Sequence, residues 1–211
     1  KSCIFHPGDI AGVLSYLRKE GINTLVFIGK IPAEVVFKKM HPSSDILFER
    51  KMPWSGEVVL KNLTSFLKKA DIKVKPLTEV LKDELAEEKL YTKIPLNKDE
   101  MEDVKRGVSL LDDIAKYRVG QSVAVKKGML VAIEGIEGTD EMIRRAGRYC
   151  KNFIVVKMAG RYKDKRFDIP VIGPDTIEIL AEAGARAIAV EAGKSIIFNC
   201  PQVVSLCNRK G

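Results

Sequence analysis

The stretch "DIAGVLSYLRKEGINTLVFIG", residues 9–29, predicts a helix that leads directly into a β-strand. Asp9 can cap the helix, apolar side chains recur at the spacing of one helical face, and Gly21 can end it. The β-branched run "TLVFIG" then has the composition of a short strand. The same order returns further along, where a helix from about Ser55 is followed by the strand "IKV".

Helices that alternate with apolar strands are typical of parallel βαβ units, so the fold class is predicted to be α/β. Residues 1–95 are predicted to form a partial Rossmann-like domain, in which no segment corresponds to the usual opening strand and Gly-rich loop. The run "YTKIPLNKDE" at residues 91–100 contains Pro95 and is typical of a domain boundary. Residues 96–211 are therefore predicted to be a separate C-terminal α/β domain.

The C-terminal domain is predicted to combine a mixed sheet with two hairpins. Its first helix has apolar residues at alternating spacings of three and four from Met101 onward. "QSVAV" and "MLVAIEG" predict a hairpin around Gly128, and "RAIAVEAGKSIIFN" predicts another around Gly193. Two helices are predicted between the hairpins. One is capped by Thr139, and the other starts at Asp175 with capping-box spacing to a later glutamate.

Composition favours a protein with an anionic partner. The chain has 211 residues, 45% of them hydrophobic, which is enough to bury a core, and its formal net charge is +8. Nucleic acid is not expected, because the lysine pairs are scattered and aromatic residues do not interleave with them. The four cysteines form no C-x-x-C pair and predict reduced thiols in a cytoplasmic protein. No apolar run approaches the roughly 20 residues needed to span a bilayer.

The segment "GRYKDKRFDIPVIGPDT", residues 160–176, places many cations and carboxylates between two apolar runs. If it is extended, Arg166 and Asp168 point to one side and their apolar neighbours to the other. A carboxylate beside a guanidinium suits a phosphate bound together with Mg²⁺, for which Asp168 and Asp164 are candidate ligands. A solvated surface loop with a few ion pairs is the alternative.

Two other segments could meet phosphate oxygens. In "AIEGIEGTDEM", residues 132–142, glycines and acids precede a helix whose N-terminal backbone N–H groups could bind phosphate while the acids hold a metal. An ordinary strand, turn and N-cap is the alternative there. In "FIGK", residues 27–30, Gly29 and Lys30 follow a strand at the end where open α/β sheets bind ligands, although this pattern is also common without a ligand.

Four segments together resemble one known family. They are "VGQSVAVKKGMLVAIEGIEGTDEMIRRAG" (119–147), "FIVVKMAG" (153–160), "KDKRFDIPVIGPDTIE" (163–178) and "AEAGARAIAVEAGKSI" (181–196). They are similar to the cytoplasmic UDP-2,3-diacylglucosamine pyrophosphatases of lipid A biosynthesis, in the two-domain class unrelated to the calcineurin-like phosphoesterases. The resemblance is dense from about residue 100 to residue 198, and it is fainter but in register from 8 to 90.

The resemblance implies Mg²⁺-dependent hydrolysis of UDP-2,3-diacylglucosamine to UMP and 2,3-diacylglucosamine 1-phosphate, with water attacking the sugar-side phosphorus. The family's Arg-x-Asp-x-Pro string places its essential aspartate at Asp168, which is expected to be catalytic and to bind Mg²⁺. Asp164 is kept as a second metal ligand. The residues expected to bind substrate, from the resemblance or from the segments above, are Gly29, Lys30, Gln121, Thr139, Asp140, Lys157 and Arg166.

An acylated UDP-sugar substrate implies a cytoplasmic protein that transiently contacts the surface of the inner membrane. The net charge of +8 suits such an anionic surface. The sequence leaves a homodimer open. The alternative from another class is a non-catalytic protein of the same fold that binds a nucleotide or a nucleotide-lipid.

Overall fold

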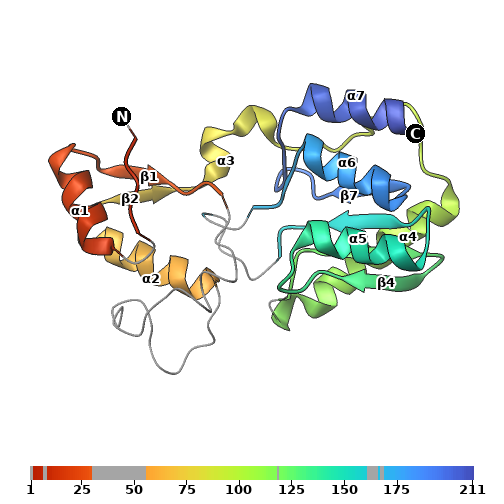
Figure 1. The fold of residues 1–211 in the computed structure, drawn as a ribbon, viewed down its shortest axis with the longest axis horizontal. Coiled ribbons are helices and arrows are strands. Elements are labelled where there is room, and N and C mark those ends of the chain that lie inside the picture. Colours follow the sequence, from red (N-terminus) through yellow and green to blue (C-terminus); the bar gives the residue numbers. More distant parts are fainter. Residues whose placement is uncertain (1, 7–8, 30–55, 118, 161–165, 167–168) are drawn as a thin grey trace. The chain divides into compact units, whose positions relative to one another are not determined.

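The structure of the protein is a computed structural model that describes residues 2–6, 9–29, 56–117, 119–160, 166 and 169–211 (Figure 1). The chain divides into two compact units, one formed by Lys1–Val80 with Asp164–Asp168 and one formed by Leu81–Lys163 with Ile169–Gly211. The elements of the N-terminal unit are α1 (Ile10–Lys19), β1 (Thr24–Val26), α2 (Gly56–Lys69), β2 (Lys73–Lys75) and α3 (Leu77–Val80). Those of the C-terminal unit are η2 (Lys82–Glu84), α4 (Lys98–Ile114), η3 (Ala115–Tyr117), β3 (Ser122–Lys126), β4 (Met129–Ile133), α5 (Thr139–Tyr149), β5 (Ile154–Lys157), β6 (Val171–Ile172), α6 (Pro174–Ala183), β7 (Ala187–Val190), β8 (Ile196–Ile197) and α7 (Cys200–Lys210).

In the N-terminal unit, β1 and β2 pair in parallel, with Leu25 opposite Val74. This pairing confirms the predicted βαβ alternation, because α2 lies between the two strands in the chain. α1 begins as predicted: Oδ1 of Asp9 accepts a hydrogen bond from the backbone N–H of Gly12 at 2.9 Å. The buried core of this unit consists of Leu14, Leu17, Leu67 and Ile72.

The C-terminal unit is built on a four-stranded mixed sheet in the order β4-β3-β5-β7. β3 pairs antiparallel with both β4 and β5, whereas β5 and β7 are parallel. The predicted α/β class and mixed sheet are confirmed, and so is the hairpin around Gly128. The hairpin's turn is held by the buried carboxylate of Asp103 on α4, which accepts backbone hydrogen bonds from Lys127 at 2.9 Å and Gly128 at 2.6 Å.

The second predicted hairpin, around Gly193, is wrong. β7 pairs in parallel with β5, and β8 pairs in parallel with β6 in a separate two-stranded sheet. Other segments hold the loop between β7 and β8. The N–H of Gly193 donates to the carbonyl of Ala86 at 2.7 Å, and Oε2 of Glu191 accepts from the N–H of Ala159 at 3.0 Å. These bonds take the chain out of the first sheet, so the two apolar runs do not pair with each other.

Helices cover both faces of the four-stranded sheet. On β3, Val123 and Val125 pack in the core with α4, and Ala124 between them packs in the core with α5 and α6. β5 repeats this alternation, with Ile154 and Val156 in the α4 core. Because both of their faces are buried, the central strands β3 and β5 are continuous apolar runs, and polar side chains are left to their ends.

The two predicted caps of the C-terminal domain are wrong. α5 begins at Thr139, but its N-cap is Gly138, with a φ of 86° and a ψ of 172° that glycine adopts without the steric cost of a Cβ. α6 has Gly173 as its N-cap and no side-chain cap hydrogen bond, so Asp175 lies inside the helix rather than at its cap. Backbone conformation rather than side-chain capping therefore starts both helices.

The two units divide between Val80 and Leu81, earlier than the boundary predicted near Pro95. The segment that follows residue 81 packs on the C-terminal unit, where Leu85 forms an antiparallel bridge with Ile196. The polypeptide before α4 is therefore held by backbone pairing and does not form an open linker.

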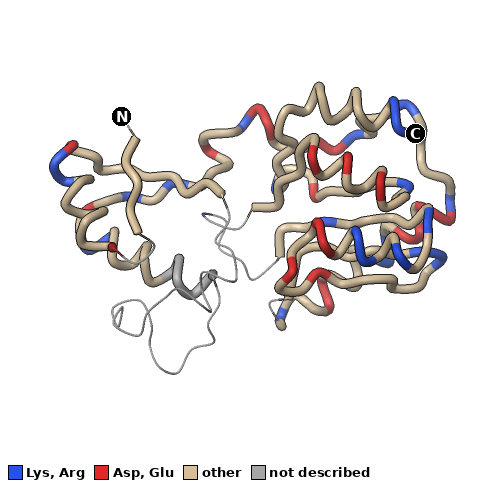
Figure 2. Tube along the Cα trace, in the orientation of Figure 1, with Lys and Arg blue, Asp and Glu red and all other residues tan. Residues whose placement is uncertain are grey.

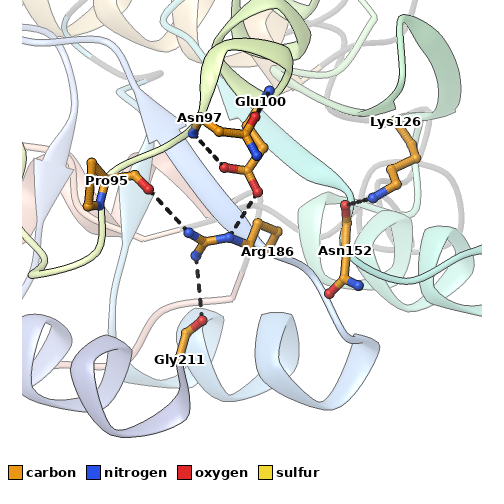
Figure 3. Close-up of polar contacts among 7 residues, drawn as sticks. All are labelled: Pro95, Asn97, Glu100, Lys126, Asn152, Arg186 and Gly211. Atoms are coloured by element: carbon orange, nitrogen blue, oxygen red, sulfur yellow. Dashed lines mark hydrogen bonds and ion pairs between the residues drawn. The ribbon is translucent and has the colours of Figure 1, made fainter.

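The polar run after Pro95 starts α4. Asn97 and Glu100 form a capping box, in which each side chain accepts a hydrogen bond from the other residue's backbone N–H. Nε of Arg186 donates to Oε1 of Glu100 at 3.0 Å (Figure 3). Its terminal nitrogens donate to the carbonyl oxygens of Pro95 at 3.3 Å and Gly211 at 3.5 Å. One guanidinium at the start of β7 thus joins three separate segments of the unit.

Acidic and basic residues are both spread over the C-terminal unit (Figure 2). α5 has Asp140 and Glu141 in its first turn, and α7 has Arg209 and Lys210 in its last turn. These positions complement the helix dipole. In the part of the chain that the structure describes, no helix is both long enough and apolar enough to cross a membrane.

Gly107 lies where α4 packs on the sheet. A methyl group there would lie 2.5 Å from Cγ2 of Val156 and 3.4 Å from Cγ2 of Val123. Alanine is the better helix former by about 1 kcal/mol, but overpacking a core costs about 1–3 kcal/mol, so we expect Gly107→Ala to be destabilising. Hydrogen exchange measured by mass spectrometry should be faster in β3 and β5. Ser109→Ala, at an exposed position of α4, is the control, and slower exchange in Gly107→Ala would contradict the prediction.

Arg186→Met should weaken the C-terminal unit while keeping an apolar stem of similar length. The side chains of Arg186 and Glu100 are 21% and 20% exposed, so the lost hydrogen bonds are only partly replaced by water. We expect the free energy of unfolding in urea to fall by about 1–2 kcal/mol. The control is Arg144→Met, which breaks an exposed ion pair with Glu141 that is worth about 0–1 kcal/mol. A larger loss in the control than in Arg186→Met would refute the structural role of Arg186.

Candidate functional site

One end of the four-stranded sheet collects polar residues. β3 begins at Ser122, which lies opposite Lys157, where β5 ends. Glu134 follows β4 at the same end, and its backbone N–H donates to the carbonyl of Ser122 at 2.9 Å. β7 runs parallel to β5, so the carboxyl ends of both strands lie here. This is the end of an α/β sheet at which ligands bind.

Five residues form a hydrogen-bonded network that we name the polar cluster: Gln121, Ser122, Glu134, Thr139 and Lys157. Nζ of Lys157 donates to Oγ1 of Thr139 at 3.0 Å, and this hydroxyl donates to Oε1 of Glu134 at 3.1 Å. Oε2 of Glu134 accepts from the backbone N–H of Gln121 at 3.0 Å. Oγ of Ser122 lies 3.3 Å from Oγ1 of Thr139. The cluster thus joins the start of β3, the loop after β4, the start of α5 and the end of β5.

The polar cluster holds a buried cation. Lys157 is only 8% exposed, and Nζ also donates to the carbonyl of Val171 at 3.2 Å. Burying an ammonium group is costly unless its hydrogens find acceptors, so the fold fixes this group in place. Thr139 is the first residue of α5, where the helix dipole and the first-turn N–H groups also attract anions. A fixed ammonium beside a helix N-terminus can bind a phosphate group.

A small pocket adjoins the polar cluster at Gln121. It lies among the end of α4, the residues that precede β3 and the residues that follow β5. Its lining consists of Leu111, Asp112, Ala115, Val119, Gly120, Gln121, Met158, Ala159 and Gly160. Glu191, which follows β7, holds the N–H of Ala159 in this lining. The pocket has a volume of about 20 Å³, which is room for about one water molecule beside the cluster.

A separate ion pair holds the loop between β4 and α5. Nη2 of Arg145 lies 2.6 Å from Oε1 of Glu137 and also donates to the carbonyl of Ile133. Burial raises the pKa of Glu137, but hydrogen bonds from its own backbone, from Arg145 and from Gly135 outweigh burial, so the pKa lies below its ordinary value. This pair therefore stabilises the loop above the ordinary pKa of a glutamate, and the stabilisation is lost as the pH falls through the lowered pKa.

The described residues offer donors for an anion more readily than ligands for a metal. Among them, no three His, Cys, Asp or Glu side chains are placed to hold a metal ion together. Glu134, the carboxylate of the polar cluster, already accepts hydrogen bonds from Thr139 and Gln121 with its two oxygens. The predicted metal ligands Asp164 and Asp168 lie outside the described residues.

Two protein-family models match the chain: the LpxI N-terminal domain over residues 2–84 and the LpxI C-terminal domain over residues 87–211. The chain belongs to the LpxI family. It is 24% identical to UDP-2,3-diacylglucosamine pyrophosphatase LpxI of Caulobacter vibrioides over 221 aligned residues, which cover 97% of the chain and 78% of that relative. The family resemblance stated from the sequence is therefore confirmed.

Three of the predicted substrate-binding residues lie together in the structure. Gln121, Thr139 and Lys157 all belong to the polar cluster, and Glu134 joins the first two. Asp140 follows Thr139 in the first turn of α5 and is exposed. Three predicted residues from the part of the chain where the resemblance is dense therefore lie in one hydrogen-bonded group at one end of the sheet.

Two other predicted site residues, Gly29 and Arg166, group with the N-terminal unit. Gly29 follows β1 in the N-terminal unit and has a φ of 106°. Arg166 is half-buried in a turn that groups with the N-terminal unit. Lys30, Asp164 and Asp168 lie outside the described residues, so the catalytic and metal-binding assignments stay predictions.

Sequence reasoning missed two features of the polar cluster. Ser122 is fully buried beside Thr139, and its one signal is a polar residue at the start of the apolar run "SVAV". Glu134 belongs to the segment of residues 132–142, whose acids are candidate metal ligands by residue type. The structure engages its oxygens in hydrogen bonds instead, because the loop and α5 bring Thr139 and Gln121 to it.

Thr139→Val should destabilise the C-terminal unit, because it removes the hydroxyl that links Lys157 to Glu134. Leaving buried polar groups without their partner costs about 1–3 kcal/mol, whereas Thr139→Ser keeps the hydroxyl and should stay close to the wild type. The free energy of unfolding in urea gives the comparison. Thr176→Val, in the first turns of α6, is a matched control. Equal stability of Thr139→Val and Thr139→Ser would show that the hydroxyl carries no structural bond.

Proposed function

We propose that the protein hydrolyses the pyrophosphate bond of UDP-2,3-diacylglucosamine in a Mg²⁺-dependent reaction, to UMP and 2,3-diacylglucosamine 1-phosphate. Membership of the LpxI family and the name of the Caulobacter relative support this proposal. The observation that carries it is structural. Three of the predicted substrate-binding residues, Gln121, Thr139 and Lys157, share one hydrogen-bonded cluster at the end of the sheet where α/β folds bind ligands.

In this proposal the polar cluster binds and orients the diphosphate. The ammonium group of Lys157 is fixed in a site with little water, where its attraction for a phosphate oxygen is stronger than at an exposed surface. Backbone N–H groups in the first turn of α5 add donors of fixed direction. Such preorganised donors stabilise the charge that develops as the phosphoanhydride bond breaks. Water attacks the sugar-side phosphorus, the bond to the bridging oxygen breaks, and that oxygen leaves with UMP.

Mg²⁺ is assigned to Asp168 and Asp164. Mg²⁺ is commonly held by one or two carboxylates, and waters and substrate phosphates complete its coordination. When bound, it neutralises charge on the diphosphate and activates the attacking water. Lys157 of the polar cluster would then contact a phosphate oxygen of the substrate, and Asp164 and Asp168 would be the protein ligands of the metal.

The substrate's acyl chains place the reaction at a membrane surface. We propose that the protein works in the cytoplasm and visits the inner membrane transiently. Anionic lipids attract basic proteins, and the formal net charge of +8 supports this contact. A homodimer stays open in this proposal.

The direct test is release of UMP from UDP-2,3-diacylglucosamine in mixed micelles, with Mg²⁺ and with EDTA as the control. UMP should form only with the metal. Reaction in ¹⁸O-water should label the lipid phosphate, and label in UMP would refute attack on the sugar-side phosphorus. Binding of the UDP-lipid without UMP release under any divalent metal would replace the enzyme with a nucleotide-lipid binding protein.

Asp168→Ala should abolish turnover while the UDP-lipid still binds, because the variant loses the proposed metal ligand but keeps the polar cluster. We expect kcat to fall by at least about 10³-fold, as for groups that stabilise only the transition state. Asp113→Ala, at an exposed position of α4, should keep the wild-type kcat and is the matched control. An active Asp168→Ala variant would move the role to another carboxylate, with Asp164 next to be replaced.

A further inference from the structure

Glu134 lies at the centre of the polar cluster although the sequence offers it only as a candidate metal ligand. Its backbone is fixed on both sides: its N–H donates to Ser122 and its carbonyl accepts from the N–H of Gly120 at 3.0 Å. Its side chain then turns to Gln121 and Thr139 with one carboxylate oxygen each. The two residues that bond to its carboxylate, Gln121 and Thr139, are both residues that the resemblance assigns to substrate.

The chain is shaped around this glutamate at Gly120. A methyl group on Gly120 would lie 2.4 Å from both Cβ and Cγ of Glu134 and 2.5 Å from its carbonyl oxygen. Contacts that short do not occur between real atoms, so only glycine fits against the stem of Glu134. The close approach limits the positions open to the stem and directs the carboxylate toward Thr139.

The hydrogen bonds from Lys157 through Thr139 to Glu134 all donate in the same direction, toward the carboxylate. An ammonium group can only donate and an ionised carboxylate can only accept, whereas a hydroxyl has one hydrogen and two lone pairs. The hydrogen of Thr139 therefore goes to Glu134, and its lone pairs receive Lys157 and Ser122. In this arrangement Thr139 has no second hydrogen for a phosphate oxygen. What it does offer is a lone pair that holds the ammonium group of Lys157.

We propose that Glu134 is a positioning residue for the reaction: it orients the Thr139 hydroxyl, and through it the ammonium group of Lys157, while its other oxygen holds Gln121. This inference rests on the proposed function for the reaction that is measured. Without two acceptor oxygens, the Thr139 hydroxyl can rotate and turn its hydrogen toward Lys157. The ammonium group would then move, and a displacement of about 1 Å at a reacting site costs on the order of 10²-fold in rate.

Glu134→Gln is the sharpest variant, because glutamine keeps the shape but has one acceptor oxygen and one donor amide. Its single oxygen can replace the acceptor for the N–H of Gln121 or the acceptor for the hydroxyl of Thr139, and its amide nitrogen would only donate at the other position. We expect kcat to fall by roughly 10–100-fold with KM changed by less than about threefold, since the substrate contacts remain but are misplaced. The control is Glu141→Gln on α5, whose exposed carboxylate pairs with Arg144; it should keep the wild-type kcat.

A double-mutant cycle separates positioning through Thr139 from a general structural effect. If Glu134 acts through the hydroxyl, Glu134→Gln should lower kcat little further in a Thr139→Val protein, because the link is already broken. Additive losses would overturn the proposal. So would a wild-type kcat in Glu134→Gln, or a loss that appears only in KM.

Hydrogen exchange tests the geometry without the reaction. In Glu134→Ala, the amide of Gln121 loses its acceptor and should exchange at least about tenfold faster, since an unpaired amide is open to water. The amide of Gly120 bonds to the backbone carbonyl of residue 134 and should keep its protection, which controls for unfolding. An unchanged exchange rate at the Gln121 amide would refute the proposal that the Glu134 carboxylate holds this amide. A wild-type protein that releases no UMP would instead overturn the proposed function, and the exchange result would still decide whether Glu134 holds Gln121.

Discussion

The coverage of both sheet faces by helices is the constraint on which the C-terminal unit depends. With α4 against one face and α5 and α6 against the other, side chains along the strands must be apolar in either direction. Polar groups can therefore gather only where strands begin or end. Lys157 is the last residue of β5, and its neighbours in the polar cluster come from the start of β3, the loop after β4 and the start of α5. The layering of the fold, more than any single motif, sets the position of the site.

Local periodicity predicted most elements because helix and strand spacing are properties of short segments. The helix after Asp9, the long helix α4 and the hairpin of β3 and β4 all follow from such patterns. The hairpin around Gly193 failed because two apolar runs separated by a glycine look the same whether they pair together or enter different sheets. The choice is made by the bonds of that loop to Ala86 and Ala159, which are distant in the sequence.

The candidate site was also predicted only in part from the sequence. Gln121, Thr139 and Lys157 were predicted to bind substrate, and the structure brings them together. The sequence could not indicate that Thr139 links Lys157 to Glu134, because that contact depends on the backbone of the loop between β4 and α5. In sequence, Glu134 resembles any acid near a helix start. Only its place against Gly120 shows why its carboxylate has a fixed direction.

Hydrogen-bond direction explains why distant residues of the polar cluster should act as one unit. The network has a donor-only end at Lys157 and an acceptor-only end at Glu134, with the hydroxyl of Thr139 between them. Lys157 and Glu134 together set the orientation of the Thr139 hydroxyl. A change at Lys157 or at Glu134 therefore changes whether this hydroxyl presents its hydrogen or a lone pair to the other residue. The cluster fixes the ammonium group through the hydroxyl of Thr139 and the carbonyl of Val171. A buried ammonium group fixed in this way favours an anionic ligand at this end of the sheet.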